Sequence, residues 1–242
     1  MIGREERSNE DIELSLAIPF YNEEENVENV VSSLCSVLEK KGTNYELILV
    51  NNGSRDKTGE ILERLSTPRT RIIHLIANAG YGGGIITGLH YCRGSYLGYS
   101  WGDDQIKAED VLAVYEKVRS EGVDWGKGLR IERNYSRQRK IISKVYNILF
   151  RAFFQIPSKD INGVPKIFRR DTFEKLDISS TDWFVDAEVM FKSQLHDFRF
   201  TEIPVVFHKR TKGQSNVNIL TVIEFVVNMI RYGRGNKFNT HA

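Results

Sequence analysis

Two adjacent aspartates, Asp103 and Asp104, directly follow an apolar run in the segment YLGYSWGDDQ, and Gln105 comes next. Their carboxylate and amide oxygens are the ligands that Mg²⁺ and Mn²⁺ prefer, and such ions bridge diphosphates. Trp101 occupies the place of a second carboxylate two residues before Asp103. Because Mg²⁺ needs only one or two protein carboxylates when phosphates supply other ligands, the turn favours a weakened metal site. A solvated helix start, with acids at the positive end of the helix dipole, explains the turn alone equally well.

The turn PFYNEE follows the first apolar run of the chain, which Pro19 ends because it cannot donate a hydrogen bond to a neighbouring strand. The Tyr21 ring suits stacking on a nucleobase, and the Glu23 carboxylate suits accepting hydrogen bonds from ribose hydroxyls. An N-cap at Asn22, followed by glutamates that complement the helix dipole, is the simpler interpretation of this turn taken by itself.

Asn51 and Asn52 end the second apolar run and begin the turn NNGSRDKT. A side-chain amide both donates and accepts hydrogen bonds, so asparagines at such a place can read the edge of a base. Gly53 allows a tight turn, and Ser54 or Asp56 can cap the helix that follows.

A glycine cluster follows the third apolar run, in the segment NAGYGGGIITG, and the residues of interest in it are Asn78, Gly80 and Gly83. Glycines at the start of a helix let backbone N–H groups approach a phosphate. The spacing is not the dinucleotide-binding fingerprint, because the third glycine that this fingerprint requires would fall on Ile85.

Short apolar runs that alternate with helical periods indicate βαβ units and a parallel sheet, whose strand ends lie along one common edge. Strands are expected at residues 13–20, 45–51, 71–77 and 95–101, with helices that follow the first, second and fourth ending near residues 40, 65 and 120. The less regular second half predicts a helix to about residue 154, a strand at 166–170, a helix at 186–195, a strand at 198–208 and a helix at 218–232. Since α/β sheets bind ligands at the carboxyl edge, the four turns are expected to share one site.

The composition is that of an ordinary globular protein, with 242 residues, 40% hydrophobic and 27% charged. The net charge of +2 gives no reason to expect a nucleic-acid partner. Cys35 and Cys92 match no metal-ligand spacing and are interpreted as buried thiols of a reduced compartment. The charged start MIGREERSNEDIE lacks the apolar core of a signal peptide, and no apolar run reaches the roughly 18 residues of a membrane span. A cytoplasmic protein is expected.

The four turns together resemble those of the family 2 glycosyltransferases with the GT-A fold, and are most similar to the dolichyl- or polyprenyl-phosphate sugar synthases. AIPFYNEEENV, LVNNGSRDKT, NAGYGGGIITG and WGDDQ resemble successive motifs of that family, over residues 14–215. The resemblance implies an α/β fold in a single domain over residues 1–242, with a Rossmann-like, mostly parallel central sheet flanked by helices and a C-terminal amphipathic helix. Its parts would be a nucleotide-sugar-binding half at 13–129, an acceptor-binding half at 130–217 and the C-terminal helix at 218–232.

The resemblance also implies roles for individual residues. Asp103 and Gln105 would bind Mg²⁺ or Mn²⁺, and Asp103 would take part in catalysis. Asp160 is the first candidate for a general base, ahead of Asp186 and Glu188. The residues implied for binding the nucleotide sugar are Pro19, Tyr21, Glu23, Asn51, Asn52, Ser54, Asn78, Gly80, Gly83, Asp104 and Arg210. Those implied for gripping the acceptor phosphate are Arg130, Arg139 and Ser143.

Trp101, Asn51 and Asn52 depart from the family pattern. Trp101 stands in the first Asp position of an Asp-x-Asp-x-Gln motif, which puts the usual metal geometry in question. Asn51 and Asn52 stand where the family usually has an acidic pair. A carboxylate only accepts hydrogen bonds, whereas an amide also donates, as the ring nitrogen of cytosine requires, so the pair raises the hypothesis of a cytidine donor.

The segment at residues 130–151 bears on the acceptor. It carries seven Arg and Lys residues and a single acid, Glu132, between apolar residues. This pattern is typical of a segment that lies at an anionic bilayer surface. A helix packed on the sheet with a solvated cationic face explains it equally well.

The resemblance and this basic segment together favour an inverting glycosyltransferase that moves a sugar from a nucleotide-diphosphate sugar to a dolichyl or undecaprenyl (polyprenyl) phosphate. The alternatives are a sugar hydroxyl acceptor in surface polysaccharide synthesis and a nucleotide-binding module that has lost catalysis. The expected partners are the nucleotide-diphosphate sugar and a lipid-phosphate or saccharide acceptor, while a membrane surface and a second copy of the chain stay open. The expected location is the cytoplasm or the cytoplasmic face of a membrane.

Overall fold

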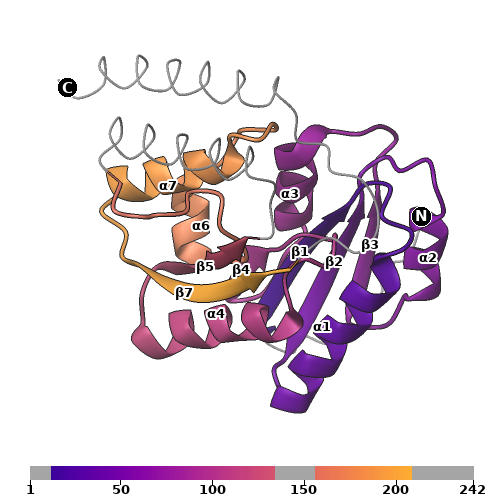
Figure 1. Cartoon of the computed structure of the whole chain (residues 1–242), viewed down its shortest axis with the longest axis horizontal. Coiled ribbons are helices and arrows are strands. Elements are labelled where there is room, and N and C mark those ends of the chain that lie inside the picture. The colour runs from indigo at the N-terminus through magenta and orange to yellow at the C-terminus, as the bar shows by residue number, and fades with distance from the viewer. Residues whose placement is uncertain (1–11, 134–155, 209–242) are drawn as a thin grey trace, which may run out of the picture.

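One seven-stranded sheet with the strand order β3-β2-β1-β4-β6-β5-β7 forms the centre of the molecule (Figure 1). The computed structural model describes residues 12–133 and 156–208. The strands are β1 (Leu14–Phe20), β2 (Tyr45–Asn51), β3 (Thr70–His74), β4 (Tyr96–Tyr99), β5 (Trp125–Arg133), β6 (Lys166–Arg169) and β7 (Phe200–Phe207). The helices are α1 (Val27–Lys41), α2 (Thr58–Arg64), α3 (Gly80–His90), α4 (Ala108–Glu121), α6 (Arg170–Leu176) and α7 (Val185–Leu195).

The strands β3, β2, β1 and β4 run parallel, and the last residue of β1, Phe20, lies opposite Asn51 at the end of β2. β1 and β2 are buried along nearly their whole length, which is why LSLAIPF and YELILVN are almost continuously apolar. The parallel sheet predicted from these runs is confirmed. The predicted extensions of β3 to residue 77 and of β4 to residue 101 are wrong, because the strands end at His74 and Tyr99.

β6 enters the sheet antiparallel, between β4 and β5, while β5 and β7 pair in parallel. The sequence predicts neither β5 nor the short helix α6. In β5, with the sequence WGKGLRIER, glycines and charges stand where residues of high strand propensity are expected. A Cβ on Gly126 would lie 3.0 Å from the Thr201 methyl group, and one on Gly128 would lie 2.9 Å from the Val164 carbonyl carbon. Close approach of neighbouring backbone and side chains therefore explains the glycines.

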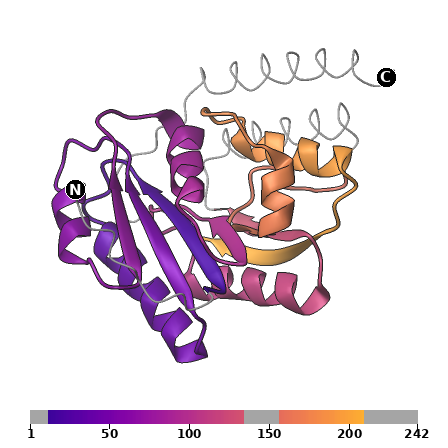
Figure 2. The ribbon, with the colours of Figure 1, turned by 180° about the vertical axis from the view of Figure 1, so that it is seen from behind.

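Helices cover both faces of the sheet. α1 and α4 pack against each other on one face, and α3, α6 and α7 lie on the opposite face (Figures 1 and 2). α1 ends at Gly42, whose φ of 72° suits glycine. Its buried residues recur with helical spacing and are Val27, Val30, Val31, Leu34 and Leu38. The helical layers leave the carboxyl edge of the parallel strands as the place where the predicted turns gather.

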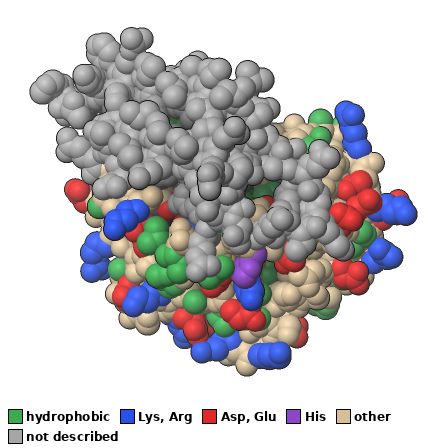
Figure 3. Space-filling view, in the orientation of Figure 1, with side chains coloured by type: hydrophobic (Ala, Val, Ile, Leu, Met, Phe, Trp, Pro, Cys, Tyr) green, Lys and Arg blue, Asp and Glu red, His purple; other side chains and the backbone are tan. Residues whose placement is uncertain are grey.

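On the face shown in Figure 3, basic and acidic side chains are interspersed over the described residues. None of the helices within 12–133 and 156–208 combines the length with the apolar character that a membrane crossing requires. The predicted helix at 218–232 and the basic segment beyond residue 133 lie outside the described residues. β5 runs across residue 129, where the two predicted halves meet, and the division into halves stays a prediction.

Gly128→Ala is expected to lower the free energy of unfolding by about 2–3 kcal/mol, because the added methyl group collides with the backbone of Val164. Gly122→Ala is the control: its site has φ of 60° and open space, so only about 1 kcal/mol of left-handed strain is expected. Urea denaturation of both variants measures the difference. A smaller loss for Gly128→Ala than for Gly122→Ala would contradict the close packing of β5.

Candidate functional site

The turn after β1 carries the first predicted residues. Pro19 lies in β1 itself, and Tyr21 follows the strand with a partly buried side chain. The Glu23 carboxylate accepts a hydrogen bond from the Asn26 amide at 2.6 Å. Asn26 is the N-cap of α1, so the alternative prediction of an N-cap at Asn22 is wrong.

Hydrogen bonds join the turn after β1 to the turn after β2. The Asn22 N–H donates to the Ser54 hydroxyl at 3.0 Å, and the Asn22 side-chain oxygen accepts from the Arg55 N–H at 2.9 Å. The Glu23 N–H donates to the Thr58 hydroxyl at 2.9 Å. Asn22 adopts φ of 53°, a conformation that asparagine tolerates better than most residues. Glu23 and Ser54 are therefore close together, as the shared site requires.

The Asn51 side chain is engaged within the protein. Its oxygen accepts from the Ser54 N–H at 3.0 Å, and its amide nitrogen lies 3.0 Å from Nδ1 of His74. The other ring nitrogen of His74 lies 2.7 Å from the Glu63 carboxylate. The amide thus orders the turn and the imidazole at the end of β3, and its predicted contact with a nucleotide stays a prediction.

Asn52 holds the glycine-rich segment in the same way. Its amide nitrogen donates to the Gly80 carbonyl at 2.9 Å and to the Asn78 side-chain oxygen at 3.3 Å. Its oxygen accepts from the Ala79 N–H at 3.0 Å. With 4% exposure and both N–H groups in use, Asn52 positions the loop that precedes α3. A carboxylate could not make the two donated bonds.

The glycines at the start of α3 let another segment lie close to the helix. A Cβ on Gly80 would lie 2.7 Å from the Thr181 carbonyl oxygen, and one on Gly82 would lie 2.7 Å from that of Asp182. The Gly83 N–H donates to the Thr181 carbonyl at 2.8 Å. Protein backbone therefore accounts for these glycines, and their predicted approach to a phosphate stays a prediction.

The acidic turn after β4 is ordered by its own polar groups. The Asp103 carboxylate accepts from the Gln105 N–H at 3.3 Å, and the Gln105 amide nitrogen donates to the His208 carbonyl at 2.8 Å. Asp104 has φ of 57° and accepts from the Asn29 amide at 2.7 Å. In the part of the chain that the structure describes, no cluster of three or more His, Cys, Asp or Glu could hold a metal ion. One carboxylate and one amide oxygen suit a cation that takes its other ligands from a diphosphate.

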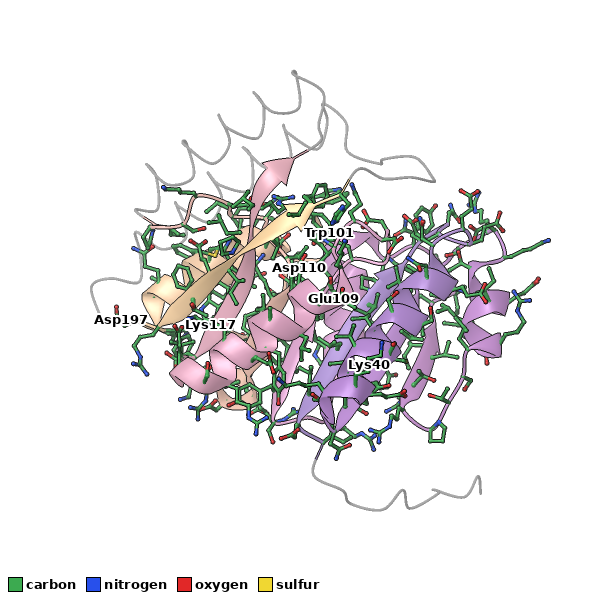
Figure 4. The ribbon with its side chains drawn as sticks, turned by 60° about the horizontal axis from the view of Figure 1, so that its bottom comes forward. Lys40, Trp101, Glu109, Asp110, Lys117 and Asp197 are labelled. Atoms are coloured by element: carbon green, nitrogen blue, oxygen red, sulfur yellow. The ribbon has the colours of Figure 1, made fainter. Side chains whose placement is uncertain are left out.

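Trp101 lies at this edge, beside the end of β7 (Figure 4). Its ring meets Phe207 edge-on, with the ring centroids 5.3 Å apart. Its indole N–H donates to the Tyr81 hydroxyl at 2.6 Å. The guanidinium carbon of Arg130 lies 5.4 Å from the centroid of the Trp101 ring, within the range of a cation–π contact. The residue that replaces the carboxylate thus joins the acidic turn to Tyr81 and Arg130.

A buried ion pair joins Arg130, predicted to grip the acceptor phosphate, to Asp160, the first candidate for a general base. The Arg130 guanidinium binds both oxygens of Asp160, at 2.8 and 2.6 Å, and the Arg130 N–H donates to the same carboxylate at 3.1 Å. Arg130 and Asp160 are 8% and 0% exposed. The buried Lys127 donates to the Asp160 main-chain carbonyl and lies 3.1 Å from the Glu202 carboxylate. Burial lowers the pKa of Lys127, and these anionic neighbours oppose that shift.

Asp186, a second candidate for a general base, is also buried and bound. Its carboxylate accepts from the Lys166 ammonium group, from the Tyr99 hydroxyl at 2.7 Å and from the Tyr81 hydroxyl at 3.1 Å. Burial, and then the charge of Asp186, raise the pKa of both tyrosines well above its usual value, so both stay neutral donors. Burial lowers the pKa of Lys166 to about 8.

Glu188, the third candidate, is fully buried on α7. It accepts from the Ser180 N–H at 2.7 Å and from the Ser179 N–H and hydroxyl, and the Lys192 ammonium lies 2.8 Å away. These donors lower the pKa of Glu188 against the opposing effect of its burial, which is the largest single influence. Glu188 therefore caps the backbone of the segment at 179–180.

Sequence reasoning did not single out Lys127, Lys166, Tyr81 or Tyr99. Each lysine lies among glycines or apolar residues, in WGKGL and VPKIF, and lysine with such neighbours is a signal of a buried, paired cation. Tyr81 lies in a glycine-rich segment and Tyr99 in an apolar run, and the neighbouring residues already account for the predicted turn and strand. Of the predicted site, Arg139, Ser143 and Arg210 lie outside the described residues.

The fold and this edge together define the class of the protein: a GT-A α/β protein whose acidic turn, asparagine pair and glycine-rich helix start meet at the carboxyl ends of parallel strands. The chain belongs to the glycosyl transferase family 2, whose family model matches residues 15–177. The resemblance seen in the four sequence motifs is therefore confirmed.

The chain is similar to many curated proteins, among them the following three. Glycosyltransferase AglD of Haloferax volcanii is 32% identical over 219 residues, which cover 86% of this chain and 35% of that protein. Polyprenol monophosphomannose synthase of Mycolicibacterium smegmatis is 25% identical over 232 residues, covering 89% and 85%. An undecaprenyl-phosphate 4-deoxy-4-formamido-L-arabinose transferase of Shewanella sediminis is 25% identical over 221 residues, covering 90% and 65%. The chain thus spans about a third of AglD and about two thirds of the arabinose transferase.

Solved structures show the same fold. Glucosyl-3-phosphoglycerate synthase of Mycobacterium tuberculosis, crystallised with Mn²⁺, UDP and glucosyl-3-phosphoglycerate, matches with a TM-score of 0.70 at 17% identity, over 90% of this chain and 79% of that chain. Mannosyl-3-phosphoglycerate synthase of Rubrobacter xylanophilus matches with a TM-score of 0.70 at 14% identity, over 96% and 76%. The predicted GT-A fold is confirmed.

Asn52→Asp is expected to lower the free energy of unfolding by about 2 kcal/mol, because a carboxylate oxygen would face the Asn78 and Gly80 oxygens that the amide now serves. Asn51→Asp is the matched control. It is expected to cost less than about 1 kcal/mol, since Nδ1 of His74 can carry a proton and donate to a carboxylate at position 51. Chemical denaturation compares the two variants. Equal losses would show that the Asn52 amide does not hold the glycine-rich segment.

Because the pKa of Lys166 falls to about 8 on folding, the unfolded chain binds more protons than the folded chain between about pH 8 and pH 10. The contribution of Lys166 to the free energy of unfolding therefore rises with pH over that interval. Between about pH 8 and pH 10, the free energy of unfolding of the wild-type protein is expected to rise by about 1–2 kcal/mol relative to that of Lys166→Met. The exposed Lys117→Met is expected to show no such difference. Denaturation at several pH values measures this, and parallel profiles for wild type and Lys166→Met would contradict it.

Proposed function

We propose that this chain transfers a sugar from a nucleotide-diphosphate sugar to a polyprenyl phosphate. Two of its relatives carry names that specify undecaprenyl-phosphate and polyprenol acceptors. The observation that carries the choice of acceptor is the state of the buried carboxylates. Asp160, Asp186 and Glu188, the three candidates for a general base, are each bound by a cation within the protein.

A hydroxyl acceptor needs a general base to remove its proton, whereas a phosphate acceptor is already anionic. A carboxylate whose oxygens already bind a cation within the protein is poorly placed to take a proton from a hydroxyl acceptor. The phosphate oxygen attacks the anomeric carbon directly, and the bond from that carbon to the nucleoside diphosphate breaks as the new bond forms. Attack from the face opposite the leaving group inverts the configuration.

Mg²⁺ or Mn²⁺ is the proposed cofactor, with Asp103 and the side-chain oxygen of Gln105 as its protein ligands. The Gln105 amide nitrogen donates to the His208 carbonyl, which directs the side-chain oxygen away from that carbonyl. When bound, the ion neutralises charge on the leaving diphosphate. Since Trp101 adds no carboxylate, the remaining ligands of the ion would come from the diphosphate and water.

Arg130 is proposed to draw in the acceptor phosphate, together with Arg139 and Ser143. Its guanidinium lies against Trp101, two residues before Asp103, and therefore beside the place proposed for the leaving diphosphate. Guanidinium groups bind phosphate through paired hydrogen bonds. Arg210 is proposed to contact the nucleotide. The basic segment at 130–151 is proposed to rest on the cytoplasmic face of a membrane, where a lipid phosphate is available.

Asp103→Asn is expected to lower transfer at least about tenfold, because it removes the carboxylate proposed to bind the cation. The full chain would be incubated with labelled UDP-, GDP-, CDP- and dTDP-sugars, Mn²⁺ and undecaprenyl phosphate in detergent, and the lipid-linked sugar extracted and counted. Asp197→Asn makes the same chemical change on an exposed residue that already tolerates φ of 52°, and it is expected to keep full activity.

Transfer to a saccharide hydroxyl, with none to the lipid phosphate, would overturn the choice of acceptor in favour of polysaccharide synthesis. Folded protein that neither binds nor transfers from any of the four nucleotide sugars would instead indicate a nucleotide-binding module without catalysis. Equal activity of Asp103→Asn and wild type would remove the proposed cation site.

A further inference from the structure

A chain of polar contacts connects the acidic turn to the loop that carries Asp160, partly buried at Trp101 and Tyr81 and fully buried at Asp186 and Lys166. The Trp101 indole N–H donates to the Tyr81 hydroxyl at 2.6 Å, and this hydroxyl donates to Asp186 at 3.1 Å. Asp186 is paired with Lys166, whose ammonium donates to the Gly163 carbonyl at 2.8 Å. These contacts join residues from the turn after β4, from α3, α7 and β6, and from the loop before β6. We call Trp101, Tyr81, Asp186 and Lys166 the buried relay.

The hydrogen bonds of the relay converge on Asp186, from Trp101 through Tyr81 on one side and from Lys166 on the other. Trp101 has a single polar atom, which can only donate, so the Tyr81 oxygen must be the acceptor and its own proton goes to Asp186. A carboxylate at position 101 would compete with Asp186 for that proton. Successive hydrogen bonds in a low dielectric strengthen one another, so the indole suits this place better than the carboxylate it replaces.

The packing around Tyr81 gives it little freedom. Its ring stacks on Trp183 with the centroids 4.5 Å apart and the planes at 15°. The partner carboxylate of Asp186 is 1% exposed, and Lys166 is fully buried, so neither can exchange its contacts for water. Any loss of the Tyr81 hydroxyl leaves Trp101 without its acceptor and Asp186 with one donor fewer.

We propose that the buried relay fixes the acidic turn relative to the Asp160 loop, and that Trp101 and Tyr81 are positioning residues for the cation at Asp103. This rests on the proposed function, because it assumes that the acidic turn binds a cation with a nucleoside diphosphate. With Trp101 in place of a carboxylate, the relay holds Asp103 and Gln105 in position without adding a ligand to the cation. Contacts of the nucleoside itself, expected at the ends of β1 and β2, do not depend on the relay.

The variants Tyr81→Phe and Trp101→Phe test this, since each keeps an aromatic ring and removes one hydrogen-bonding group. Calorimetric titration with UDP, GDP, CDP and dTDP, each with and without Mn²⁺, gives the factor by which Mn²⁺ tightens binding of the nucleotide that wild type prefers. In both variants this factor is expected to fall about five- to tenfold, while metal-free binding changes less than about twofold. A general loss of fold would weaken both kinds of binding together.

Tyr45→Phe is the matched control. Tyr45 is a buried tyrosine at the opposite end of the parallel strands, and its hydroxyl donates to Glu39 at 3.1 Å. The Mn²⁺ factor is expected to equal that of wild type. If Tyr81→Phe and Trp101→Phe also match wild type, the inference fails and the proposed function stands. If wild type binds none of the four nucleotides, the proposed function fails and the inference fails with it.

Discussion

A charged carboxylate buried where three other elements meet α7 is the constraint around which this site is arranged. Asp186 is 1% exposed, so its lost hydration has to be replaced by donors from the protein. Lys166 supplies an opposite charge from β6, Tyr99 a hydroxyl from β4 and Tyr81 a hydroxyl from α3. Each donor belongs to a different element, so satisfying this one charge sets how those elements are placed against α7.

The parallel half of the fold could be predicted from the sequence. A strand that is buried on both faces has apolar residues along its whole length, and such a run is easily recognised. β1 and β2 are of this kind, and their ends place Asn51 and Glu23 at one edge. β5 could not be predicted in this way. Its glycines are required by the close approach of Val164 and Thr201, and such tertiary contacts are not visible in the sequence. Lys127 in β5 is fully buried, although a lysine is usually expected at the surface.

Residue chemistry located the polar groups of the site, but it could not tell which of them the protein itself already uses. Asn52 offers donors that suit a base edge, yet both serve the Asn78 side chain and the Gly80 carbonyl. These contacts could not be predicted because they join turns that are far apart in the sequence. An amide in place of an acid therefore changes how the glycine-rich segment is held, and this substitution by itself no longer argues for a cytidine donor.

The buried carboxylates differ in their partners, which distinguish those that hold the structure from the one that remains a candidate for a role in sugar transfer. Glu188 binds backbone N–H groups, and Asp186 binds hydroxyls and an ammonium group, so removing either charge would leave buried donors unsatisfied. Asp160 differs, because its partner Arg130 is a cation of the kind that binds phosphate. An arriving phosphate can therefore share the guanidinium with Asp160 without leaving a buried charge unpaired. An anionic acceptor suits this pair, whereas a neutral hydroxyl would find each of the three candidate bases, Asp160, Asp186 and Glu188, already bound by a cation.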